Sequence, residues 1–251
     1  MNRFSLEGRL ALVTGASRGI GAAIAVGLAE AGADLVLAGR QVDGLAETAG
    51  KVSALGRQVS TVTCDVSSVA SIEACFAGLS DAPDILINNA GVEEVCPSLD
   101  VDEALWEKIL GTNLKGAFFV AQNFARPLVA AKRAGAIINI CSLTSGIGIP
   151  TATPYTASKT GLLGVTRALS AEWATKGIRV NGIGPGYFRT ELTEAFYEDE
   201  SWQAAMLAKI PMARFGGLDD LVGAAVFLAS DGAGYVTGQL LYVDGGYMAS
   251  I

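Results

Sequence analysis

A tyrosine and a lysine that could handle a proton stand four residues apart in this sequence. Tyr155 and Lys159 belong to the segment PYTASK, and the preceding Pro154 suits the start of a helix. Residues i and i+4 share one face of a helix, so the lysine ammonium would lie near the phenol. A nearby positive charge favours the phenolate and lowers the pKa of the phenol toward neutrality. The spacing predicts a tyrosine general acid/base, which Ser142, following an apolar run, could join.

The composition narrows the remaining choices of chemistry. The chain has 251 residues, four cysteines without a Cys-x-x-Cys pair, and no histidine. Histidine acid/base catalysis and serine-histidine hydrolysis are therefore excluded. Mixed Cys/His zinc sites are excluded for the same reason, and no metal site is expected. A proton must move through tyrosine, lysine, a carboxylate or water.

A glycine-rich segment near the amino terminus has the features of a pyrophosphate site. The apolar run LALVT (10–14) leads directly into TGASRGIG (14–21) and then an alanine-rich stretch with helical spacing. Glycines permit a tight turn and let backbone N–H groups at a helix start approach phosphate. A purely structural turn would need glycine too, so the position after the first strand carries the prediction. The predicted binding residues are Gly15, Ser17, Arg18, Gly19, Ile20 and Gly21.

The end of the second apolar run bears on which dinucleotide would bind. In NAD-binding folds an acidic residue about twenty positions after the glycines holds the ribose 2′-hydroxyl. This run instead ends in Arg40, and Arg18 lies in the glycine turn. A guanidinium pairs well with a 2′-phosphate, so the sequence favours NADP(H). The alternative interpretation is two solvated surface charges, and nearby Asp43 leaves room for NAD(H).

Short apolar runs alternate with helical segments along the chain. Apolar residues on consecutive positions indicate strands buried on both faces, which is typical of a parallel sheet covered by helices. We therefore predict one doubly wound α/β domain over residues 1–251, with seven parallel strands. Aromatic and acidic residues at 187–213 break the alternation and predict a lid insertion. The predicted strands are 10–14, 34–39, 58–64, 84–88, 136–141, 178–183 and 239–244, and the helical segments include 20–31, 42–55, 68–79, 105–130 and 157–175.

The charge balance bears on the partners of the chain. The net charge of −7 and the pI near 4.7 give no electrostatic support for binding nucleic acid or an anionic membrane. The amino terminus lacks an apolar signal region, and no run of about twenty apolar residues follows. We expect a cytoplasmic protein that acts on a small molecule.

These residues together resemble the short-chain dehydrogenase/reductase family across essentially the whole chain. The joint order and spacing of the motifs carry the resemblance. They are TGASRGIG (14–21), Asp65-Val66, Asn88-Asn89-Ala90-Gly91, Asn113, Ser142, Tyr155-x-x-x-Lys159, Pro185-Gly186 with Thr190, Tyr235-Val236-Thr237-Gly238 and Asp244-Gly245-Gly246.

The resemblance implies a role for each matching residue. Tyr155 would be the acid/base, Ser142 would hold the substrate oxygen, Lys159 would also bind the nicotinamide ribose, and Asn113 would support a water-mediated proton relay. It further implies a homotetramer. The implied cofactor contacts are Asp65 and Val66 at the adenine, Asn88, Asn89, Ala90 and Gly91 at the adenosine ribose, and Pro185, Gly186, Phe188 and Thr190 at the nicotinamide end.

The substrate is the least defined part of the prediction. Segments 154–159, 180–188 and 190–193 look most like gluconate 5-dehydrogenases and related sugar-acid dehydrogenases. Residues 145–150 depart from that group, because an apolar rim containing Ile147 and Ile149 suits a carboxylated polyol poorly. The alternative is a 3-oxoacyl-carrier-protein reductase or a broad ketone reductase, although an acidic lid would repel an acidic carrier protein. A non-catalytic dinucleotide-binding sensor is the alternative from another class, and the four catalytic-type residues argue against it.

Overall fold

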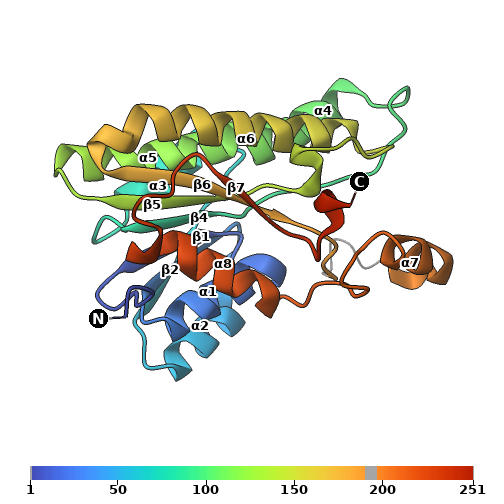
Figure 1. The fold of residues 1–251 in the computed structure, drawn as a ribbon. Coiled ribbons are helices and arrows are strands. Elements are labelled where there is room, and N and C mark those ends of the chain that lie inside the picture. Colours follow the sequence, from blue (N-terminus) through green and yellow to red (C-terminus); the bar gives the residue numbers. More distant parts are fainter. Residues whose placement is uncertain (1, 190–196, 251) are drawn as a thin grey trace.

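A computed structural model of the chain describes residues 2–189 and 197–250. In them, seven parallel strands form one sheet in the order β3-β2-β1-β4-β5-β6-β7, with helices on both faces (Figure 1). All seven predicted apolar runs form strands, so the predicted doubly wound α/β fold is confirmed. The strands are β1 (Leu10–Thr14), β2 (Asp34–Gly39), β3 (Val59–Thr63), β4 (Ile85–Asn88), β5 (Gly135–Ile140), β6 (Ile178–Pro185) and β7 (Leu240–Val243).

The burial of each strand follows its place in the sheet. Strands β1, β2, β4, β5 and β6 are buried at almost every position, since helices cover both of their faces. Strands β3 and β7 lie at the two edges and are largely exposed or only partly buried. The continuous apolar pattern marks the central strands β1, β2, β4 and β5, and the more polar VSTVT of β3 marks an edge. It does not distinguish β7, whose apolar LLYV lies at the other edge.

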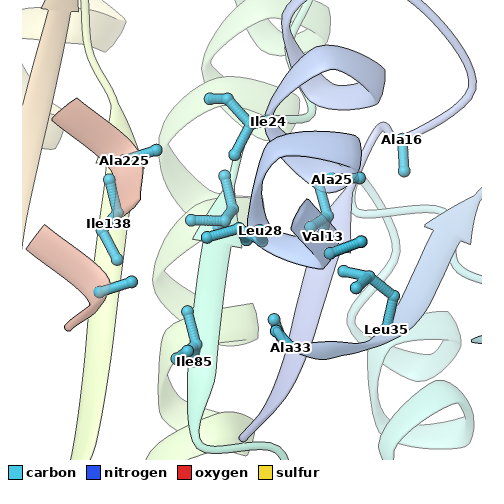
Figure 2. Close-up of a cluster of buried hydrophobic side chains, with 14 of the residues drawn as sticks. Val13, Ala16, Ile24, Ala25, Leu28, Ala33, Leu35, Ile85, Ile138 and Ala225 are labelled. Carbon is cyan, nitrogen blue, oxygen red and sulfur yellow. The ribbon is translucent and has the colours of Figure 1, made fainter. Parts of the chain in front are cut away.

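Two hydrophobic clusters hold the helices against the sheet, one on each face. On one face α1 (Gly19–Glu30), α2 (Ala46–Ala54) and α8 (Asp219–Ala229) cover the strands. Figure 2 shows Ile24 and Leu28 of α1 lying between Val13 of β1 and Ala225 of α8. The opposite face carries α3 (Val69–Ala77), α5 (Ala117–Ala130) and α6 (Thr153–Trp173).

The segment predicted as one long helix over 105–130 is interrupted. It forms α4 (Glu103–Leu110), a π-helical turn (Gly111–Gly116) and then α5. A side chain at Gly116 would collide with the carbonyl oxygen of Val66, so glycine lets this turn approach the loop after β3. Such wide turns often occur at functional sites, and this one carries Asn113.

Among the described residues of the predicted insertion at 187–213, helix α7 (Glu200–Leu207) stands outside the two helix layers (Figure 1). Residues 190–196 of this segment, including Thr190, lie outside the described residues. None of the helices in the described part is both long enough and apolar enough to cross a membrane.

Candidate active site

A cavity of about 1060 Å³ opens where the strands end at their carboxyl edge. Parallel sheets present ligand sites at this edge, because loops from neighbouring strands converge there. The cavity brings together most of the residues that the sequence singled out. Its lining includes Gly15, Ser17, Arg18, Gly19, Ile20, Arg40, Asp65, Val66, Asn89, Ala90, Gly91, Ser142, Tyr155, Lys159, Pro185, Gly186 and Phe188.

The first turns of α6 hold the tyrosine and the lysine together. Pro154 lies in the first turn, as predicted, and the ammonium of Lys159 lies 5.5 Å from the centre of the Tyr155 ring. Lys159 Nζ also donates a hydrogen bond of 2.7 Å to the carbonyl oxygen of Ile140, at the end of β5. Ser142 follows the same strand, and its hydroxyl accepts a bond of 3.2 Å from the Thr144 N–H. One helix and one strand end thus position all three side chains.

Burial is the main influence on the pKa values of Tyr155 and Lys159. Desolvation raises the pKa of Tyr155 well above its ordinary value, the negative charge of Glu93 adds to the rise, and a hydrogen bond with Ser142 opposes it. Desolvation likewise lowers the pKa of Lys159. The lowered tyrosine pKa expected from the four-residue spacing is therefore wrong for the protein by itself, since desolvation of the phenol and the charge of Glu93 raise that pKa. The phenol is protonated at neutral pH.

Asn113 lies behind the cavity and connects two of its walls. Its side-chain oxygen accepts a bond of 2.8 Å from the Val92 N–H, and its amide donates to the Val92 carbonyl at 2.8 Å. The same amide donates to Ser158 Oγ at 3.2 Å, and Ser158 donates in turn to the Tyr155 carbonyl at 2.7 Å. Asn113 therefore ties the loop after β4 to the start of α6.

The nucleotide end of the cavity fits a dinucleotide phosphate. Gly15 and Gly19 have φ angles of 65° and 56°, in the left-handed region that favours glycine. The N-terminus of α1 has no side-chain cap and no acidic residue in its first turn. Its backbone N–H groups and its dipole therefore suit an anion. Gly21 does not line the cavity: a side chain there would collide with the Gly15 carbonyl, so this glycine lets α1 pack against the turn.

Arg40 and Asp65 lie close together on the wall of the nucleotide end. Hydrogen bonds from Ser67, at 2.7 and 3.0 Å, lower the pKa of Asp65, and the charge of Arg40 lowers it further. Both residues line the cavity together with Val66. An arginine and a carboxylate at this position could contact the two parts of an adenosine, its ribose and its base.

The two neighbouring asparagines after β4 have different surroundings. Asn89 lines the cavity and donates to the carbonyl oxygens of Thr14 and Gly15 at 3.0 and 3.1 Å. Asn88 is buried in the protein and donates to Ala117 and Asn139 instead, at 2.9 and 3.1 Å. The side chains of consecutive residues turn to opposite sides of the backbone, so only one of the two asparagines can line the cavity. The sequence gives no sign of which one it is.

The substrate end is lined by aromatic residues of the segment predicted as a lid and by one acidic residue that the sequence did not assign. Tyr187, Tyr197 and Trp202 line the cavity, and Trp202 packs edge to face against both tyrosines, with ring centres 5.3 to 5.6 Å apart. Glu93, the unassigned residue, also lines the cavity. Glu93 lies two residues after the Asn-Asn-Ala-Gly motif, in the loop that follows the central strand β4. A carboxylate just beyond the carboxyl end of a central strand was the signal that could have identified it.

A doubly wound sheet, a glycine turn before α1 and a Ser-Tyr-Lys group at the carboxyl edge define a dinucleotide-dependent oxidoreductase. A family model described as enoyl-(acyl carrier protein) reductase matches residues 15–248. The chain belongs to the short-chain dehydrogenase/reductase family, whose members include its relatives below. It is therefore an NAD(P)-dependent oxidoreductase that acts on a CH–OH group.

Several proteins are similar to this chain over almost all of its length. Gluconate 5-dehydrogenase of Gluconobacter oxydans is 41% identical, with 99% of this chain and 98% of that protein covered. The 2-dehydro-3-deoxy-D-gluconate 5-dehydrogenase of Pseudoalteromonas atlantica is 44% identical, with 99% of each covered. A crystal structure of gluconate 5-dehydrogenase from Burkholderia cenocepacia in complex with NADP and tartrate is 40% identical, with a TM-score of 0.96 and coverage of 100% and 99%.

Proposed function

We propose that the chain transfers a hydride reversibly between NADP(H) and a secondary alcohol or ketone, with Tyr155 as general acid/base. The observation that carries this proposal is that Ser142, Tyr155 and Lys159 line the same cavity as the glycine turn before α1. The bound dinucleotide supplies or accepts the hydride. The protein must then hold the substrate oxygen and move one proton.

Each polar side chain has one task in that reaction. Ser142 holds the substrate oxygen beside the Tyr155 phenol. In reduction the protonated phenol gives its proton to that oxygen, and in oxidation it takes the proton back. The Lys159 ammonium, fixed by Ile140, stabilises the phenolate that remains and would bind the nicotinamide ribose. Asn113 holds the loop after β4 and would support a water-mediated path for proton return.

A preference for NADP(H) over NAD(H) rests on two arginines. Arg18 and Arg40 both line the nucleotide end of the cavity, where a ribose 2′-phosphate could pair with a guanidinium. The Burkholderia relative was crystallised with NADP, which supports the same choice. The other proposed cofactor contacts that line the cavity are Asp65, Val66, Asn89, Ala90, Gly91, Pro185, Gly186 and Phe188. Thr190 is also proposed and lies outside the described residues.

A sugar acid such as gluconate or 5-ketogluconate is the proposed substrate, supported by the names of the relatives. Activity as a 3-oxoacyl-carrier-protein reductase or a broad ketone reductase is the second candidate, and Ile149 on the cavity wall favours it. Ile147, the other isoleucine of the apolar rim, packs instead against the cluster of Leu143, Ile210 and Tyr247. The aromatic segment within 187–213 would act as the substrate lid.

The test is absorbance of the reduced nicotinamide, with NADPH and NADH in separate assays. The substrates are 5-ketogluconate, a β-ketoester and a cyclic ketone. We expect 5-ketogluconate to be reduced fastest, with NADPH. Faster turnover of the β-ketoester would favour the second candidate, and a preference for NADH would overturn the roles of Arg18 and Arg40. Nucleotide binding without turnover of any compound would indicate a sensor.

A further inference from the structure

Glu93 places a carboxylate at the substrate end of the cavity. It is partly buried, lines the cavity, and belongs to the loop that follows β4. At Gly91, two residues earlier, that loop passes so close to the reacting group that an added Cβ would lie 3.7 Å from Lys159 Nζ. The charge of Glu93 acts on both Tyr155 and Lys159. Glu93 therefore lines the cavity on the loop that passes close to the proposed acid/base.

The position of Glu93 is fixed by the backbone beside it. Val92 is held by two hydrogen bonds of 2.8 Å to Asn113, which also bonds Ser158 of α6. These bonds connect the start of α6, through Ser158 and Asn113, to the backbone next to Glu93. The backbone from which the Glu93 side chain extends into the cavity is therefore fixed, which lowers the cost of ordering this wall around a ligand.

The charged neighbours of Glu93 leave its carboxylate available to a substrate. Lys159 faces it but donates to Ile140, and Lys108 on α4 pairs with Glu94 at 2.7 Å. No hydrogen bond joins the Glu93 carboxylate to another side chain in the part of the chain that the structure describes. Arg18 and Arg40 line the same cavity at the nucleotide end. A partly buried carboxylate without such bonds favours a ligand that donates hydrogen bonds and disfavours an anion.

We propose that Glu93 is a specificity-determining residue that accepts a hydrogen bond from a hydroxyl on the carbon next to the reacting carbonyl. The preferred substrates are then α-hydroxy ketones and the corresponding vicinal diols. A carboxylate directly beside the carbonyl is rejected. This inference rests on the proposed function and narrows its substrate class. A sugar acid that reacts at C5 satisfies it, because hydroxyl-bearing carbons flank C5 and the acid group lies far along the chain.

A matched series of four-carbon ketones tests the proposal. 1-Hydroxy-2-butanone, 2-butanone and 2-oxobutanoate carry a hydroxymethyl, a methyl and a carboxylate group on the same ethyl ketone. A hydrogen bond to a charged group contributes enough to predict a preference of about tenfold in kcat/KM for the hydroxy ketone over 2-butanone. We expect 2-oxobutanoate to be the poorest of the three.

Two substitutions separate charge from hydrogen bonding at position 93. Glu93→Gln keeps an acceptor but removes the charge, so it should raise activity with 2-oxobutanoate and keep part of the hydroxy-ketone preference. Glu93→Leu removes the acceptor, so the preference should disappear while 2-butanone is still reduced. Glu94→Gln is the matched control, because Glu94 is exposed, pairs with Lys108 and does not line the cavity.

The outcomes distinguish this inference from the proposed function. Equal activity with the hydroxy ketone and 2-butanone, or an unchanged ratio in Glu93→Leu, overturns the role of Glu93 and leaves the proposed function intact. No turnover of any ketone by the unmodified protein overturns both. A ratio that changes in Glu93→Leu but not in Glu94→Gln supports the inference.

Discussion

The nucleotide end and the substrate end of the cavity are lined by different chemical groups. At the nucleotide end the lining combines a glycine turn and the start of α1 with the side chains of Arg18, Arg40 and Asp65. At the substrate end it consists of side chains, among them Glu93, Tyr187, Tyr197 and Trp202. The glycine turn accepts little change of residue type, because a Cβ at Gly15 or Gly21 would lie 3.0 Å or less from neighbouring atoms. A surface made of side chains can change its ligand by single substitutions.

The difference explains which part of the function is defined by family membership. The relatives match almost the whole length of this chain at about 40% identity, and the one from Burkholderia cenocepacia was crystallised with NADP. The ligand of the substrate end depends on a few positions. One of these is Glu93, which adds a negative charge to the cavity wall.

The largest expected effect on activity comes from removing the Tyr155 hydroxyl, where the nucleotide end and the substrate end of the cavity meet. Tyr155→Phe should lower kcat by about a hundredfold to ten-thousandfold, because the ring remains but the proton donor is lost. NADP+ should still bind, as measured by calorimetry. Tyr235→Phe, which alters an exposed phenol, is the control. Turnover near the unmodified level in Tyr155→Phe would contradict the mechanism.

Adding a methyl group at Gly21 should lower the stability of the protein by disturbing the glycine turn at the nucleotide end. In Gly21→Ala the new Cβ meets the Gly15 carbonyl and the Asn89 amide, so we expect a loss of about 1–3 kcal/mol in the free energy of unfolding. Urea denaturation measures it. Gly50→Ala in α2 is the matched control, since its Cβ meets nothing within 4 Å and should stabilise the helix slightly. Equal stability of the two variants would show that the turn is not tightly packed.

Removing one of the two arginines should weaken the preference for NADP(H). Arg40→Ala should reduce kcat/KM for NADPH by about tenfold, the contribution of one charge-assisted hydrogen bond, and leave kcat/KM for NADH nearly unchanged. Arg57→Ala serves as the control, because Arg57 pairs with Asp34 at 3.0 Å and does not line the cavity. A parallel loss with both nucleotides would instead indicate a structural role for Arg40.

The smallest expected effect concerns an exposed ion pair after the lid segment. Hydrogen bonds from Arg214, at 2.6 and 3.0 Å, lower the pKa of Asp220 to about 2. Because the folded pKa is below the unfolded one, this stabilisation is present above pH 4 and is lost as the pH falls from about 4 to about 2.

Thermal unfolding across that range should therefore show a smaller acid-induced loss in Asp220→Asn than in the unmodified chain. Asp219→Asn, a neighbouring change in the first turn of α8, is the comparison. Identical pH profiles for the unmodified chain and Asp220→Asn would mean that solvent screening removes the contribution of the pair.

The predicted α/β sheet follows from local features that need no partner. The apolar runs that became β1, β2, β4 and β5 are buried on both faces in the structure, and their continuity in the sequence already indicated it. The Tyr155 and Lys159 pair depended only on helical spacing and on Pro154. The homotetramer and the lid function of residues 187–213 stay predictions.

Three features could not be read from spacing. The π-helical turn at Gly111–Gly116 exists because that segment approaches Val66, a residue far away in the sequence. Asn88 and Asn89 received different roles from their surroundings. The pKa of Tyr155 rises where spacing predicted a fall, because desolvation depends on everything packed around the phenol.

The sequence by itself determined the central strands, the glycine turn and the residue types of the candidate site, since these depend on short-range periodicity and on motifs whose order is specific. Only the tertiary structure decided which of them share a cavity, which asparagine lines it, and that Glu93 lines it together with Tyr155 and Lys159. Burial and the approach of distant segments set these properties. They arise when β1, β4, β5 and β6 are placed side by side.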